Sequence, residues 1–325
     1  MTGTDQKKLL TISGLDISFH QGYKAAHALR GVELTVKTGE IHALVGESGS
    51  GKTVTARSIL GLLPVPPASI NGGSVRFEQH ELIGLTETEM QAIRGNRIAM
   101  VFQEPSLYLN PAYRIGEQIT EMLIVHRGRT RQQAVEGAQE LLDKVGLGDR
   151  RRVLSSYPHE LSGGMKQRAM IAMAISCGPS LLIADEPTTA LDVTVQRQIL
   201  QLLMKLNHLL GMAILFISHD LAVIHDISDT ISVIYAGKVV ETAGRNQLFE
   251  TPLHPYTKLL LASIPDPERR GQRLQTIPGR IPDAEAVPSG CAFHPRCPWM
   301  EQICKTTVPP LLEYDDGRTA ACHLI

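Results

Sequence analysis

One stretch of the sequence has the residue types and spacing needed to hold a nucleoside triphosphate. The pattern G-x-x-x-x-G-K-[ST] is matched by Gly46, Glu47, Ser48, Gly49, Ser50, Gly51, Lys52 and Thr53, and Val54 completes the predicted binding segment. Glycines let backbone N–H groups turn toward phosphate oxygens, and a helix beginning near Lys52 adds its positive N-terminal end. We therefore expect Lys52 to reach the β- and γ-phosphates of ATP and the Thr53 hydroxyl to bind Mg²⁺.

Two adjacent carboxylates, Asp185 and Glu186, end an apolar segment over residues 181–184. Asp185 can hold Mg²⁺, directly or through water, and Glu186 can orient and deprotonate an attacking water molecule. In isolation, a strand followed by an acidic helix cap would be the commoner interpretation. A phosphate loop in the same chain favours a hydrolytic site instead.

Two further polar residues come just after predicted strands. Gln103 follows the apolar residues 98–102, and His219 follows the apolar residues 213–217. Ligands bind at the carboxyl ends of strands in open α/β sheets, so both side chains are candidates for the same site. Gln103 can contact Mg²⁺ and the attacking water, and His219 can contact the γ-phosphate. Without the phosphate loop, each would be interpreted as an ordinary loop or structural residue.

A second glycine-rich turn, with Ser162, Gly163 and Gly164, opens another predicted helix. Its N–H groups and hydroxyl suit an anion. The first loop already takes this chain's own phosphates, so the second turn would serve a nucleotide held by another subunit. An ordinary N-cap by Ser162 is the alternative, and is the simpler interpretation of the turn alone.

The hydrophobic periodicity places these motifs on an α/β fold. Strands are predicted over 9–19, 28–36, 40–45, 75–77, 98–102, 181–184 and 213–217, helices over 52–62, 115–145 and 193–209, and a hairpin over 230–240 with its turn at Ala236 and Gly237. This alternation predicts a mainly parallel sheet covered by helices. Prolines become frequent after Pro252, so we expect a main domain over 1–252, with a helical subdomain at about 105–160, and a loop-rich extension over 253–325.

Composition limits the possible functions. Lys plus Arg number 32 and Asp plus Glu 33, which gives a formal net charge of −1. A general nucleic-acid binder would carry a basic excess, so no nucleic-acid partner is expected. No apolar run reaches the ~18 residues of a membrane-spanning helix, and the N-terminus lacks an apolar signal core. We expect a cytosolic chain that meets a membrane only through partners.

Four of the five cysteines lie in the last 35 residues, at Cys291, Cys297, Cys304 and Cys322. Disulfides are disfavoured in a cytosolic chain. Four thiolates can hold Zn²⁺, although zinc sites usually contain closer C-x₂₋₄-C pairs, or an iron–sulfur cluster. Free thiols are the third alternative. His294 and His323 are alternative ligands or plain surface histidines, and Cys177 is expected to be a small buried apolar residue.

Together, in this order, the motifs resemble the ABC ATPase family, whose remaining mark is the run of Ala190, Leu191 and Asp192. The resemblance covers residues 9–252. It implies a P-loop ABC nucleotide-binding domain with a RecA-like parallel core, an antiparallel β subdomain and a helical subdomain. It also implies a head-to-tail dimer in which Ser162, Gly163 and Gly164 complete the partner's ATP site. Phe19, or alternatively Tyr23, would stack on adenine.

The segment that begins at His254, Pro255, Tyr256 and Thr257 resembles the extension of oligopeptide, dipeptide and nickel importer ATPases. This resemblance implies an ATP hydrolase that powers import of di- or oligopeptides or a similar solute. The implied partners are a second ATPase in a heterodimer, two transmembrane permeases gripped by the helical insert, and an extracytoplasmic solute-binding protein. The chain would lie at the cytoplasmic face of the inner membrane. Dipeptide importers with similar cysteines carry a [4Fe–4S] cluster, and Zn²⁺ stays the alternative.

Two other functions compete with import. A soluble ABC ATPase of translation usually has two cassettes in one chain, and one of DNA repair has a long coiled-coil insertion. This sequence has one cassette and a short insert. An exporter ATPase is the third possibility, and the extension argues against it by resemblance.

Overall fold

The computed structural model describes residues 7–22, 24–189, 191–264 and 276–325. The chain forms two compact units that interleave along the sequence. Unit 1 contains Lys37–Ile41 and Gly84–Ile217, and unit 2 contains Lys8–Val36, His42–Ile83 and Ser218–Ile325. The domain boundary that the sequence predicts near residue 252 stays a prediction.

Unit 2 contains an antiparallel sheet with the strand order β2-β1-β4-β5. Its strands are β1 (Lys8–Gln21), β2 (Lys24–Lys37), β4 (Ala68–Phe77) and β5 (His80–Glu81). At the start of β1, Leu10 and Ile12 are fully buried, whereas Thr11 between them and Ser13 after them are partly or fully exposed. This alternation is what one buried face of an antiparallel sheet requires.

Unit 2 also contains the strand and helix that frame the phosphate loop. Strand β3 (Ile41–Val45) is buried at every position and pairs in parallel with β9 (Thr230–Tyr235). Helix α1 (Lys52–Ile59) begins directly after the loop. Strand β10 (Lys238–Gly244) returns from β9 through a two-residue turn. Both turn residues, Ala236 and Gly237, have positive φ, as this type of tight hairpin demands.

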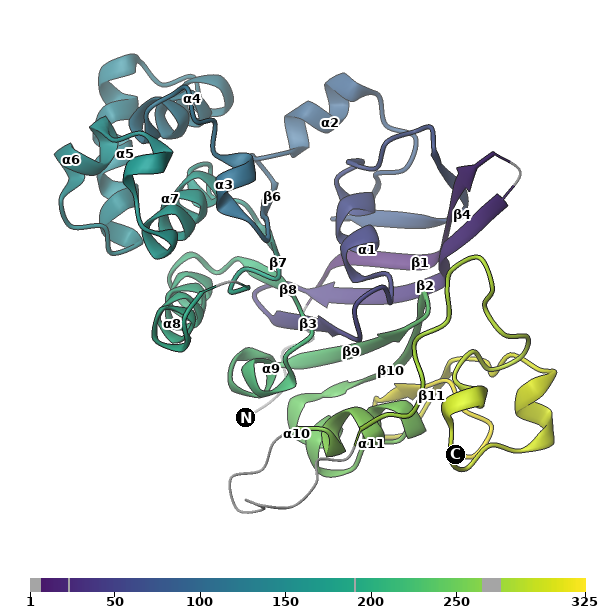
Figure 1. Cartoon of the computed structure of the whole chain (residues 1–325). Helices are drawn as coiled ribbons and strands as arrows, with labels where there is room; N and C mark the ends of the chain where they lie inside the picture. The colour runs from purple at the N-terminus through teal and green to yellow at the C-terminus, as the bar shows by residue number, and fades with distance from the viewer. Residues whose placement is uncertain (1–6, 23, 190, 265–275) are drawn as a thin grey trace. The chain divides into compact units, whose positions relative to one another are not determined.

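The C-terminal extension adds two short strands beside β10. Helices α9 (Leu221–Ile227), α10 (Arg245–Glu250) and α11 (Pro255–Ala262) precede two single-turn helices at His294–Arg296 and Gln302–Lys305 and two short strands, β11 (Leu312–Glu313) and β12 (Thr319–Ala320). Strand β12 pairs with both β10 and β11. Figure 1 shows this segment in yellow beside β10.

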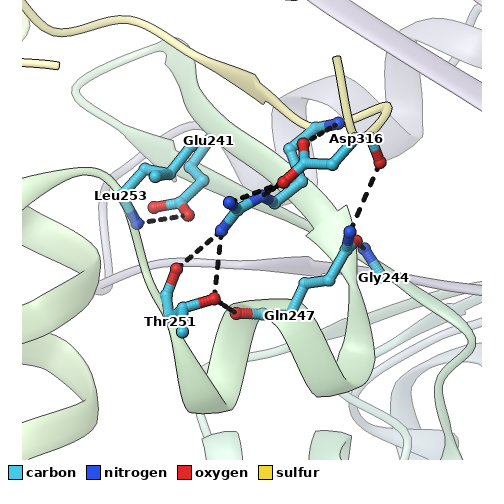
Figure 2. A network of polar contacts seen from close by, with 7 residues as sticks. Glu241, Gly244, Gln247, Thr251, Leu253 and Asp316 are labelled. Atoms are coloured by element: carbon cyan, nitrogen blue, oxygen red, sulfur yellow. Dashed lines mark hydrogen bonds and ion pairs between the residues drawn. The ribbon is translucent and has the colours of Figure 1, made fainter. Parts of the chain in front are cut away.

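A polar network fastens the extension to the turn before α11. Glu241 of β10 accepts a hydrogen bond from the backbone of Leu253, and Gln247 donates to the Asp316 carbonyl (Figure 2). Arg318 pairs with the Asp316 carboxylate and donates to the Thr251 carbonyl at 2.7 Å. These contacts make residues 312–320 a packed part of unit 2.

Unit 1 is built on three parallel strands whose residues are buried throughout: β6 (Ile98–Val101), β7 (Leu181–Asp185) and β8 (Ala213–Ser218). Strands buried on both faces read as continuous apolar runs, which is why the sequence identified them. Helix α8 (Val193–Leu210) ends at Gly211, a left-handed C-cap.

The other helices of unit 1 come before and after β6 along the chain. They are α2 (Glu87–Ile93), α3 (Pro105–Tyr108), α4 (Ile115–Arg127), α5 (Arg131–Lys144), α6 (Arg150–Ser155), a single-turn helix at Pro158–Glu160, and α7 (Gly163–Ile175). Helices α4 to α7 pack on one another (Figure 1). Gly128, in the left-handed conformation, ends α4 and divides the predicted helical stretch in two.

Within the described parts of the chain, no helix is both long and apolar enough to cross a membrane. The expected strands, the helices after residues 51 and 192, and the hairpin at Ala236 and Gly237 are all confirmed. The expected helix over 52–62 is shorter and ends at Ile59.

Candidate functional site

The phosphate loop runs from β3 to α1 in unit 2, as its sequence context predicts. Lys52 is buried, and its Nζ donates to the carbonyl oxygens of Gly46 at 2.8 Å and Glu47 at 3.0 Å. Two of the loop glycines, Gly49 and Gly51, have φ values of 83° and 108°, which other residues rarely adopt. The loop therefore already has the folded-in lysine and turned backbone of a phosphate-binding loop.

The hairpin between β9 and β10 supports this loop from one side. The Gly237 N–H donates to the Ser50 carbonyl at 2.8 Å. A Cβ atom on Gly51 would lie 2.9 Å from a methyl carbon of Leu29, and one on Gly46 would collide with the Ile234 carbonyl. Close backbone packing, as well as phosphate access, thus requires glycine at both positions.

The extension supports the same loop from another side. The Glu47 N–H donates to the Tyr256 hydroxyl at 3.0 Å, and the Glu47 carboxylate pairs with Arg296 at 2.9 Å. Burial is the largest cause of a raised Tyr256 pKa, so this hydroxyl stays protonated. Arg296 was not singled out from the sequence, because no local pattern links it to residue 47.

In unit 1, the predicted catalytic carboxylate and its predicted neighbour are in contact. Asp185 is buried at the end of β7, and Glu186 follows with a φ of 45°. A left-handed non-glycine residue is a strained position of the kind that gathers at functional sites. The Gln103 amide donates to Glu186 Oε2 at 3.1 Å, and the Thr189 hydroxyl also donates to that oxygen at 3.1 Å.

The second glycine-rich turn begins α7 in unit 1. Ser162 is its N-cap, and its hydroxyl accepts a hydrogen bond from the Met165 N–H at 3.3 Å. A Cβ on Gly164 would lie only 2.8 Å from Val195 Cγ1 at the start of α8, whereas Gly163 has more room. The N-cap interpretation therefore holds within the chain, and the role toward a partner's nucleotide stays a prediction.

Three other predicted residues are placed as follows. Phe19 lies near the end of β1 in unit 2 and is half-buried. His219 directly follows β8 and is exposed. Asp192 caps α8, where its carboxylate accepts from the Val195 N–H at 3.0 Å. Tyr23 and Ala190 lie outside the described residues.

The four C-terminal cysteines gather in unit 2, and none forms a disulfide. The Cys291 N–H donates to the Cys304 carbonyl at 2.9 Å. Burial is the main cause that raises the pKa of Cys291, and electrostatic interaction with Cys304 and Cys322 raises it further. However, among the described residues no group of three or more His, Cys, Asp or Glu side chains is arranged to hold a metal ion. Cys177 is buried in unit 1, as predicted.

A lysine-bearing phosphate loop at a helix start, a carboxylate pair ending a parallel strand, and a glycine-rich turn opening a second helix define a P-loop ATPase of the ABC class. A family model described as "ABC transporter" matches residues 29–189, and one described as "Oligopeptide/dipeptide transporter, C-terminal region" matches 240–304. The chain belongs to the family of ABC transporter ATP-binding proteins.

Several relatives match nearly the whole chain. A putative peptide import ATP-binding protein of Brucella melitensis is 48% identical over 98% of this chain and 97% of its own length. The oligopeptide transport ATP-binding protein AppD of Bacillus subtilis is 46% identical, with 97% and 96% covered. The dipeptide transport ATP-binding protein DppD of Escherichia coli is 42% identical, with 97% and 96% covered.

A similar solved structure is an ATP-binding cassette, captured as a dimer in a post-hydrolysis state with ADP and Pi. It has a TM-score of 0.65 and 29% identity, and the match covers 73% of this chain and 99% of that one. The predicted P-loop ABC fold is thereby confirmed. The iron–sulfur cluster and the heterodimer stay predictions.

Proposed function

We propose that this chain hydrolyses ATP to power import of di- or oligopeptides through a membrane transporter. The observation that carries the proposal is the contact between Glu186 and Gln103 in a chain that also has an intact phosphate loop. The C-terminal family match and the names of the relatives favour peptides as the cargo. They also favour transport over a soluble role in translation or DNA repair.

Each of the predicted site residues has its own role in ATP binding and hydrolysis. Residues 46–54 hold the phosphates of ATP, with Lys52 on the β- and γ-phosphates. Thr53 and Asp185 bind Mg²⁺, with Gln103 as a further ligand. Glu186 takes a proton from the attacking water, and Gln103 holds that carboxylate in place.

His219 and Phe19 act at the two ends of the nucleotide. His219 contacts the γ-phosphate, and Phe19 stacks on adenine. Both roles are carried over from the family resemblance, and the half-buried ring of Phe19 and the exposed position of His219 are compatible with them.

Gln103 also begins the path to the permease. It precedes α3, whose Tyr108 ring stacks on the ring of Phe102 with the two centroids 3.8 Å apart. Leu107 on the same helix is 73% exposed, and Tyr113 just beyond is 55% exposed. Exposed apolar side chains beside the residue that contacts Glu186 suit a surface that docks the membrane subunits and senses hydrolysis.

We place the chain at the cytoplasmic face of the inner membrane, held there by two permease subunits. An extracytoplasmic solute-binding protein would deliver the peptide. A second, similar ATPase would pair with this chain as a heterodimer, with Ser162, Gly163 and Gly164 facing the partner's nucleotide. The N–H groups at the start of α7 and the short side chains there support this arrangement.

We further propose that Cys291, Cys297, Cys304 and Cys322 hold a [4Fe–4S] cluster, with Zn²⁺ as the alternative. Four thiolates suit either group. Arg30 and Lys238 line a cavity of about 20 Å³ together with Cys291, so two cations stand beside a site that would carry net negative charge. The thiol groups would need to turn toward a common centre, because the described residues form no ready ligand set.

Metal analysis of anaerobically purified protein tests the cysteine site. About four irons with acid-labile sulfide and visible absorbance support the cluster. One zinc and no colour support the alternative, and a metal content equal to that of Cys291→Ser protein contradicts both.

Peptide uptake tests the transport function. The chain is reconstituted in proteoliposomes with two permease subunits and a solute-binding protein from the same organism, and labelled di- and oligopeptides are supplied. ATP-dependent peptide accumulation is expected. Hydrolysis that responds to ribosomes or DNA, with no response to peptide, would instead support the soluble alternative.

A further inference from the structure

Arg296 lies far from the phosphate loop in sequence but contacts it in unit 2. Its Nη1 donates to Glu47 Oε1 at 2.9 Å and its Nη2 to Glu47 Oε2 at 3.1 Å. The Arg296 side chain is 6% exposed, and that of Glu47 is 30% exposed. Two parallel hydrogen bonds fix both the separation and the relative orientation of the guanidinium and the carboxylate. A single pair of flexible, exposed side chains fixes neither.

Other parts of unit 2 fix Arg296 in this position. Its Nε donates to the Pro278 carbonyl at 2.8 Å, and its Nη1 also lies 3.3 Å from the Tyr235 hydroxyl. The guanidinium carbon sits over the Tyr235 and Phe293 rings, at 5.7 and 6.0 Å from their centroids. These contacts hold the Arg296 guanidinium in one orientation, in which it binds the Glu47 carboxylate.

A second contact from the extension holds the backbone at the same residue. The Tyr256 hydroxyl accepts from the Glu47 N–H at 3.0 Å. Tyr256 is fully buried, and its ring centroid lies 4.7 Å from that of Tyr235 and 5.3 Å from that of Phe293. On the other side of Glu47, its carbonyl accepts from Lys52, the residue expected to bind phosphate.

We propose that Arg296 is a positioning residue for ATP binding: by gripping Glu47, the C-terminal extension holds the phosphate loop in its nucleotide-accepting shape. This inference rests on the proposed function, since it assumes that residues 46–54 bind ATP. A loop already held in its bound shape loses less entropy when the ligand arrives, so the grip raises affinity without touching the nucleotide. The extension then sets the ATP concentration at which the subunit works.

Binding of MgATP to the full-length chain tests the proposal, with Arg296→Met as the main variant. We expect a dissociation constant roughly tenfold higher than in the wild type, which corresponds to ~1.4 kcal/mol. Glu47→Gln should weaken binding similarly, and the double variant should be no worse than the worse single one, because both changes remove one interaction. Arg296→Lys should recover only part of the affinity, since lysine cannot pair in bidentate fashion.

Arg318→Met is the matched control, because Arg318 is a paired arginine of the same extension that bonds Thr251 and Asp316 instead of the loop. Its ATP affinity should equal that of the wild type. In the assembled transporter, Arg296→Met should raise the KM for ATP and leave kcat at saturating ATP nearly unchanged. A purely structural role would lower kcat and the amount of folded protein together.

Three results would overturn the proposal: wild-type affinity in folded Arg296→Met protein, equal weakening by Arg318→Met, or additive effects in the double variant. If Arg296→Met fails to fold, Glu47→Gln decides, because it leaves every other contact of Arg296 in place. If the wild-type chain itself binds no MgATP, the proposed function fails and this inference fails with it.

Discussion

His254 provides a quantitative test of how unit 2 is packed. It is 1% exposed at the N-cap of α11, and its Nδ1 accepts a hydrogen bond from the Tyr256 N–H at 3.0 Å. An accepting Nδ1 requires a ring that carries no proton there. Burial first, and then the charge of Lys258, lower the pKa of His254 to about 3. The folded chain therefore keeps this histidine neutral over the whole mildly acidic range.

The difference between the His254 pKa values of the folded and unfolded chains makes the free energy of unfolding depend on pH. The unfolded chain protonates this histidine near its ordinary pKa of 6.5, whereas the folded chain does so only near 3. The stabilising contribution is thus fully present above pH ~6.5 and is lost as the pH falls toward ~3. Between about pH 7.5 and about pH 5.5, the free energy of unfolding should fall by ~1.4 kcal/mol on account of His254 alone.

Urea denaturation of the wild type and of His254→Asn measures this contribution. Asparagine can accept the same N-cap hydrogen bond but does not titrate. Trp299, the chain's single tryptophan, lies in the extension and reports its unfolding by fluorescence. Glu241 accepts from the His254 N–H at 2.8 Å, and burial raises its pKa. Acidification therefore increases the contribution of Glu241 to the free energy of unfolding, which is opposite to the effect of His254. Glu241 is present in both the wild type and His254→Asn.

The informative quantity is consequently the difference between the two proteins. The wild type should lose ~1.4 kcal/mol more than His254→Asn over the stated pH interval. Equal losses in the two proteins would refute a neutral, buried His254.

Three further substitutions have defined outcomes. Gly46→Ala should abolish MgATP binding, because the added Cβ would collide with the Ile234 carbonyl. Gly148→Ala should bind MgATP normally, because its added Cβ would have no other atom within 4 Å. Titration of the two proteins with MgATP distinguishes these outcomes. Gly164→Ala should lower the melting temperature more than Gly163→Ala, because the nearest atom would be 2.8 Å away in the first case and 3.6 Å in the second. Arg318→Met should lower the free energy of unfolding in urea, through its lost bonds to Asp316 and Thr251, and a change below the error of the measurement would contradict that role.

The sequence predicts those parts of the fold that depend on local pattern. The continuous apolar run of β7 and the glycine spacing of the phosphate loop each occur within one short segment, and so does the hairpin turn at Gly237. The element ends are less predictable. Helix α1 stops three residues early, although no proline or glycine interrupts it before Gly61.

The long-range contacts that hold the phosphate loop could not be predicted from local sequence patterns. The bond between Arg296 and Glu47 spans 249 positions, and that between Tyr256 and Glu47 spans 209. Such pairs arise because β12 pairs with β10 and so fixes the extension within unit 2, a tertiary event without a local signal. The left-handed backbone of Glu186 is equally hidden, because glutamate does not favour that conformation.

The most direct measurement is steady-state ATP hydrolysis by the assembled transporter with wild-type and Glu186→Gln chains, beside MgATP binding by each. We predict that Glu186→Gln protein binds MgATP about as tightly as the wild type but loses at least ~99% of the turnover contributed by this subunit's site, because no base activates the water. If the proposed second ATPase is present, the same assay is also run with its corresponding glutamate replaced, so that turnover can be assigned to this site. Unchanged turnover in Glu186→Gln protein under those conditions would contradict the assignment of Glu186 as the catalytic base.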